Sequence, residues 1–265
     1  MVQWKRYARL YRVQTGQFIK TILQSKADFV MGLVGFFLTQ VSGIVFLSLV
    51  FQQIPTLQGW SFEQLLFIYG FAQIPRGIDH LLTDNIWLVA WRLVINGGFD
   101  RYMLRPMNVF FQVISEKLQP DSLGELLVGF LLVGRALGTG VLVVDGVHIA
   151  LFALSVLAGA LIYTAVKLFF ASFAFWFKSS GPALQVAYET ANFAKYPTEI
   201  YAKPVRFIIT WVIPFAFVAY LPATYFLGIR SAGVIAAECL IGAALFGVAY
   251  GLFCYGITKY ESCGN

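Results

Sequence analysis

The chain has 265 residues, of which 59% are hydrophobic and only 12% are charged. A soluble domain carries about a quarter charged residues, so this composition excludes an ordinary soluble protein and predicts an integral membrane protein. The net charge of +6 does not indicate a nucleic-acid partner, because basic loops beside membrane spans report topology instead.

Residues 1–27 predict a basic amphipathic helix that lies along the cytoplasmic membrane surface. Aromatic residues recur at helical spacing, and basic residues fall on a neighbouring face. The aromatic residues are Trp4, Tyr7, Tyr11 and Phe18, and the basic ones are Lys5, Arg9 and Arg12. Such a helix binds the lipids of an anionic leaflet with its apolar face. The alternative is a solvated helix end, which would leave large aromatic side chains in water.

Residues 28–265 predict a transmembrane domain of six helical spans. The clearest is 29–51, which carries no charged residue and is long enough to cross a hydrocarbon core of about 30 Å. A second span, 62–78, begins after the capping-box pattern Ser61-x-x-Gln64. Further spans are predicted at 123–144, 149–177 and 234–257.

The stretch 178–231 allows two interpretations of the fifth span. Either 178–206 is a cytoplasmic loop and 207–228 a straight span, or 181–194 is a short polar span followed by a hairpin that enters from the outer side. Four prolines would bend such a hairpin, namely Pro197, Pro204, Pro214 and Pro222. Non-helical backbone is tolerated at membrane depth where protein or a water-filled cavity surrounds it. The hairpin would place Lys195, Lys203 and Arg206 on the outer side, against the usual charge bias.

The distribution of basic residues predicts the orientation. The N-terminal segment and the region 92–117 are rich in Lys and Arg, whereas the loops 52–61 and 145–148 contain neither. The positive-inside rule therefore places the N-terminus, the segment 96–108 and the C-terminus in the cytoplasm.

The segment 96–108, Asn-Gly-Gly-Phe-Asp-Arg-Tyr-Met-Leu-Arg-Pro-Met-Asn, is a polar stretch interrupted by glycine and proline. Aromatic and Arg side chains are the usual anchors of a protein contact, so the segment is a candidate docking site for a partner. The candidate contact residues are Gly98, Phe99, Asp100, Arg101, Tyr102, Leu104, Arg105 and Pro106. The alternative is a solvated turn.

Four polar residues are candidates for a translocation path. Arg135 and Lys167 lie inside predicted spans, where a charge is costly and needs a polar environment. Glu189 and Asn192 would line a path if 181–194 is a span. The alternatives are snorkelling or pairing within the chain for the two cations, and ordinary loop positions for the other two.

Taken together, these features resemble the permease subunits of ABC type-2 exporters, specifically bacterial permeases that work with a separately encoded ATPase. The resemblance covers essentially the whole chain and is most specific at 98–108 and 196–215. It implies an all-α membrane protein of the type V ABC exporter kind, with six spans, an interfacial N-terminal helix and an outer re-entrant hairpin over 196–228. It also implies a bacterial inner-membrane location and a second, identical or similar permease.

In that family the segment after the second span is a coupling helix seated in a groove of the ATPase, which here would be 96–108. The sequence contains no G-x-x-x-x-G-K-[ST] phosphate loop, and the glycine-rich stretch 134–140 lacks the Lys. We therefore expect no catalysis and no cofactor in this chain, with ATP and Mg²⁺ bound by the partner.

The leading functional hypothesis is an exporter subunit for a hydrophobic or amphipathic substrate, because aromatic residues make up 17% of the chain. An ATP-independent channel or secondary carrier is the alternative; it would place intramembrane charges at matched positions of two repeated halves.

Overall fold

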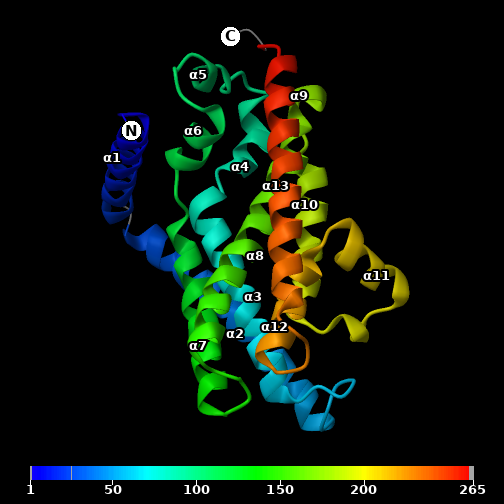
Figure 1. The fold of residues 1–265 in the computed structure, drawn as a ribbon. Helices are drawn as coiled ribbons and strands as arrows, with labels where there is room; N and C mark the ends of the chain where they lie inside the picture. The colour runs from blue at the N-terminus through cyan, green and yellow to red at the C-terminus, as the bar shows by residue number, and fades with distance from the viewer. Residues whose placement is uncertain (1, 25, 263–265) are drawn as a thin grey trace.

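The computed structural model describes residues 2–24 and 26–262, and it is helical throughout apart from turns and one isolated β-bridge between Leu57 and Trp60. The predicted all-α class is confirmed. The N-terminal region forms α1 (Val2–Gln24), which stands beside the main bundle (Figure 1), and its position on a membrane surface stays a prediction. The side chains of Trp4, Lys5 and Phe18, on which its predicted amphipathic character partly depends, lie outside the described side chains.

Four long helices form the body of the protein. They are α3 (Phe62–Thr83), α7 (Leu123–Gly138), α8 (Gly146–Ser172) and α13 (Gly233–Lys259). α8 packs along α13, and α3 packs along α7. α2 (Lys26–Gln53) contacts α7, with its outer face largely exposed.

The two ends of the bundle differ. Both termini lie toward one end, together with α5 (Asp100–Met103) and α6 (Val109–Glu116), whereas the α2–α3 and α7–α8 connections lie at the other (Figure 1). This arrangement agrees with a chain that crosses the bundle an even number of times.

Within residues 2–24 and 26–262, three helical stretches are long and apolar enough to cross a membrane, namely Phe29–Gln53, Gly146–Phe177 and Gly233–Lys259. They coincide with the first, fourth and last predicted spans. The second predicted span is α3. The third is shorter than predicted, because α7 ends at Gly138 and Gly140 adopts a positive φ of 70°. The count of six spans stays a prediction.

The region 181–228 is a broken chain of short helices. It contains α10 (Gly181–Glu189), η3 (Thr190–Lys195), α11 (Lys203–Phe207), η5 (Ile208–Val212), η6 (Phe215–Phe217) and α12 (Tyr220–Phe226). The pair Lys203–Val212 and Phe215–Phe226 is bent by 73°, so the straight-span interpretation of 207–228 is wrong. The physical reason is Pro214, which has no N–H and forces an extended conformation on Ile213. A re-entrant hairpin and a broken span both fit this geometry, so the hairpin stays a prediction.

Glycines allow α3 and α7 to approach each other closely. A Cβ added to Gly129 would lie 2.7 Å from Ile74 Cγ1 and 3.0 Å from the carbonyl oxygen of Gly70. Small residues at a crossing let helix backbones come close, which is the main source of packing between membrane helices.

We expect Gly129→Ala to lower the stability of the protein by about 1–3 kcal/mol, because the added methyl group overpacks this crossing. The thermal midpoint of the purified protein in detergent measures the effect. Gly134→Ala is the matched control on the same helix, since its methyl group meets nothing within 4 Å. Equal midpoints for the two variants would contradict the close crossing.

Candidate functional site

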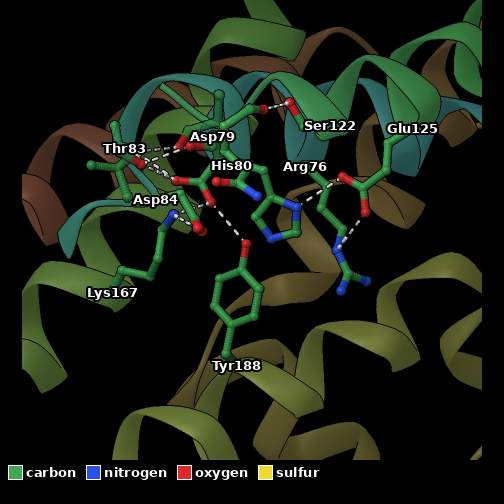
Figure 2. Close-up of polar contacts among 12 residues, drawn as sticks. Arg76, Asp79, His80, Thr83, Asp84, Ser122, Glu125, Lys167 and Tyr188 are labelled. Atoms are coloured by element: carbon green, nitrogen blue, oxygen red, sulfur yellow. Dashed lines mark hydrogen bonds and ion pairs between the residues drawn. The ribbon is translucent and has the colours of Figure 1, made fainter. Parts of the chain in front are cut away.

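Asp79 on α3 is the centre of a buried polar cluster (Figure 2). Its Oδ1 accepts hydrogen bonds from Thr83 Oγ1 at 2.7 Å and Thr164 Oγ1 at 2.9 Å. Its Oδ2 accepts one from the Tyr188 hydroxyl at 2.8 Å and lies 2.9 Å from Lys167 Nζ. The Asp79 cluster thus joins α3, α8 and α10 through one carboxylate.

The Asp79–Lys167 ion pair has no exposed side-chain surface. A charge at such a site is stable only when paired and hydrogen-bonded, and this carboxylate has partners on both oxygens. Asp84 Oδ1 lies 3.8 Å from the same ammonium group. The structure therefore places Lys167 in an intrachain pair in the closed interior, one of the two alternatives that its sequence position allowed.

Glu125 on α7 is the centre of a second cluster. Its Oε2 lies 2.9 Å from His80 Nδ1, and its Oε1 lies 3.6 Å from Arg76 Nε. Arg76 in turn donates to Asn192 Oδ1 at 3.0 Å, and Asn192 Nδ2 donates to Glu189 Oε2 at 2.7 Å. The Glu125 cluster therefore connects α7, α3 and the region 181–195, and it brings together the predicted residues Glu189 and Asn192.

Tyr188 on α10 lies between the two clusters. Its ring stacks on His80 at a centroid distance of 5.6 Å. The Arg76 guanidinium carbon lies 5.8 Å from the ring centre, and Lys167 Nζ lies 5.7 Å from it. Cations over an aromatic face are attracted to it, so Tyr188 holds both clusters in contact.

A pocket of about 510 Å³ opens beside the Glu125 cluster. One wall is α2, which contributes glycines and the side chains of Thr39 and Gln40. The other carries Arg76, Glu125, Asn192 and Lys195. Two cations and one carboxylate in a pocket of this size can bind the polar part of a small molecule.

Arg135 is apart from these clusters. It forms a two-pronged ion pair with Glu63, with NH2 at 2.6 Å from Oε1 and Nε at 3.1 Å from Oε2. Its side chain is 55% exposed. The structure therefore does not bring Arg135 together with Lys167, Glu189 and Asn192.

Sequence reasoning assigned no role to Glu125, Tyr188 or Glu238. Glu238 is fully buried in α13, where its Oε2 accepts a hydrogen bond from Ser155 on α8 at 2.5 Å. A single acid inside a long apolar run is a signal of function or of specific pairing, and this signal could have identified Glu238. No group of acidic, His or Cys side chains that could hold a metal occurs in the described part of the chain.

Two aromatic residues hold the segment 96–108 in place. Phe99 is fully buried, with ring-centre distances of 5.0 Å to Phe175 and 5.2 Å to Tyr260. Tyr102 is also buried and donates a hydrogen bond to Glu116. Burial, followed by the bond to Glu116, raises the pKa of Tyr102 to about 12, so its hydroxyl keeps its proton at neutral pH.

The other predicted contact residues of this segment are more exposed. Leu104 has 85% of its surface exposed, and Arg105 and Pro106 beside it are also exposed. Arg101 lies 2.7 Å from Glu116 as a half-exposed ion pair, while Asp100 accepts a hydrogen bond from Ser262 at 2.6 Å. Gly98 lies in the turn that precedes α5. The segment 96–108 therefore has a base anchored by Phe99 and Tyr102 and an exposed tip at 104–106.

We expect Lys167→Met to destabilise the protein by about 3–5 kcal/mol, because it leaves the Asp79 carboxylate buried without its cation. Equilibrium unfolding in detergent measures the loss. The double variant Asp79→Asn with Lys167→Met removes both charges and is expected to lose less than Lys167→Met alone. A larger loss in the double variant would contradict the ion pair as the reason for the loss.

Comparison with known proteins identifies the family. The model of the family described as "ABC-2 family transporter protein" matches residues 37–264, which include the long helices, both polar clusters and the segment 96–108. No curated protein sequence matches the chain. The chain therefore belongs to the ABC-2 transporter family, as a multi-pass membrane permease component that associates with an ABC ATPase subunit.

Proposed function

We propose that this chain is the permease subunit of an ATP-driven exporter in the bacterial inner membrane, with six spans and both termini in the cytoplasm. It would pair with a second, identical or similar permease, and two ATPase subunits would bind ATP and Mg²⁺. Family membership supports the ATP-driven mechanism over an ATP-independent channel. The observation that carries the proposal is the segment 96–108, whose base is buried and whose tip is free to bind a partner.

The tip of this segment is suited to a partner groove. Leu104 offers an apolar side chain in water, with the cation of Arg105 and the rigid ring of Pro106 directly after it. Arg is enriched among the residues that dominate protein contacts, and an exposed apolar side chain beside it adds surface that a partner can bury. Phe99 and Tyr102 face the interior instead, so in this proposal they support the tip rather than touch the ATPase.

Movement of the tip would reach the bundle through Asn108. Its side chain caps α6 by accepting from the Phe111 N–H at 2.9 Å, and its Nδ2 donates to the Tyr250 hydroxyl on α13 at 2.7 Å. Its own backbone N–H donates to the Tyr7 hydroxyl on α1 at 3.2 Å. The Tyr7 and Phe111 rings pack edge to face at 4.8 Å. One residue thus connects the docking segment to α1, α6 and α13.

An amphipathic substrate fits the character of the interior. The Glu125 cluster and its pocket offer cations, an acid and an amide, while the surrounding helices are apolar. In the proposed exporter, Asn192 and Glu189 contact the polar part of the substrate, and Lys167 remains a structural cation until the helices move apart. Arg135, paired with Glu63 on the exposed surface, is not assigned to the path.

We expect Leu104→Asp and Arg105→Glu each to weaken ATPase binding by about tenfold or more, because each places an acid at the centre of the contact. Co-purification of the ATPase in mild detergent, with a binding titration, measures the change. The matched control is Ile229→Asp, since Ile229 is 52% exposed and lies in the connection between α12 and α13. Wild-type ATPase binding by both tip variants, with normal membrane insertion, would contradict the proposal.

A further inference from the structure

A second pocket lies on the side of the molecule formed by α11, α12 and the start of α13, where α11 projects from the bundle (Figure 1). Its volume is about 670 Å³. None of its lining residues belongs to the two polar clusters described above. The pocket is therefore a separate feature of the broken region 196–231.

Three cations line this pocket, namely Lys203, Arg206 and Arg230. Arg206 lies 3.5 Å from Glu199, a long and partly exposed contact. Lys203 and Arg230 form no ion pair with any residue that the structure describes. The pocket consequently has an excess of positive charge that the chain itself leaves unbalanced.

Glu238, the acid next to the lining in sequence, does not neutralise these cations. It follows the lining residue Ala237, but its side chain is fully buried and bonded to Ser155 on α8. Hydroxyl groups of Thr198, Thr210 and Ser231 add hydrogen-bond donors to the lining. The first residues of α13 also line the pocket, and the N-cap Ala232 provides no side-chain cap. The start of this 27-residue helix adds a positive dipole end, which favours an anion.

One wall of the same pocket is apolar. It includes Trp211, Phe217 and Leu221, with Trp211 68% exposed. A site for a free inorganic ion does not need such a wall. Cations, hydroxyls and an aromatic wall together match an amphiphile with a phosphate or carboxylate head group.

The position of the three cations in the proposed topology also indicates that the pocket binds an anionic ligand. In the topology proposed above, Lys203, Arg206 and Arg230 lie away from the cytoplasmic end, where the positive-inside rule disfavours basic residues. Their presence needs a reason, and binding of an anionic group supplies one. We propose that this pocket binds the anionic head group of an amphiphile, with the chain of that molecule against Trp211. The proposal goes beyond the permease function and holds for either direction of transport.

The test uses the full-length protein in dodecyl maltoside and decyl phosphate as the probe. Tryptophan fluorescence and the thermal midpoint are followed during the titration. We expect saturable binding that raises the midpoint, and a Kd about tenfold or more higher in Arg206→Gln with Arg230→Gln, because two charge-assisted contacts are lost. Arg92→Gln with Lys117→Gln is the control, since it removes two exposed cations outside the pocket and gives the same net charge.

Three outcomes would overturn the proposal. These are an equal response of the pocket and control variants, an equal midpoint shift by decylphosphocholine, and an equal shift by inorganic phosphate alone. Nanodiscs of phosphatidylglycerol or phosphatidylcholine then identify the source of the ligand. A midpoint gain in phosphatidylglycerol that the pocket variant loses supports a lipid head group. Decyl phosphate binding without that gain supports another anionic amphiphile, such as a transported substrate.

Discussion

The ion pair between Asp79 and Lys167 is the constraint on which the interior depends. Both charges are fully buried, so neither is tolerable unless α3 and α8 stay in register. Tyr188 completes the carboxylate's partners and fixes α10 against the same two helices. Because Tyr188 also stacks on His80, the Glu125 cluster depends on the same arrangement. The region that follows α10 consists of short 3-10, α and π segments, and the bond of Tyr188 to Asp79 attaches the start of this region to the bundle.

The protein has a different chemistry at each end, and α13 runs between them. Near one end, Tyr250 of α13 accepts a hydrogen bond from Asn108, next to the exposed tip 104–106. At the other, the first residues of α13 line the cationic pocket. Glu238 and Ser155 fasten the helix to α8 in between. α13 therefore runs from a residue bonded to Asn108, which follows the proposed ATPase contact, to the lining of the proposed amphiphile site.

Composition predicted the membrane class, and the positions of the long apolar runs predicted the three longest apolar helices, because both depend on local hydrophobicity. The bend at Pro214 was one of the two alternatives that the sequence predicted, because proline changes the backbone only near its own position. The sequence did not indicate which charged side chains pair with each other. Lys167 and Arg135 looked equivalent as intramembrane cations, yet the first pairs with Asp79 in the interior and the second with Glu63 at the surface. Such partners are distant in sequence and are set by tertiary packing. Likewise Phe99 and Tyr102 looked like surface anchors within a polar segment, whereas both are buried against the chain's own helices.

The opposite placement of the two ends is the central claim, and labelling of single cysteines tests it most directly. In a variant with Cys239, Cys254 and Cys263 replaced by Ser, Leu104→Cys and Ile229→Cys are treated with a membrane-impermeant maleimide. The expected result is labelling of Ile229→Cys in intact cells, and of Leu104→Cys only after the cells are permeabilised. Labelling of Leu104→Cys in intact cells, or protection of both positions until permeabilisation, would contradict the claim.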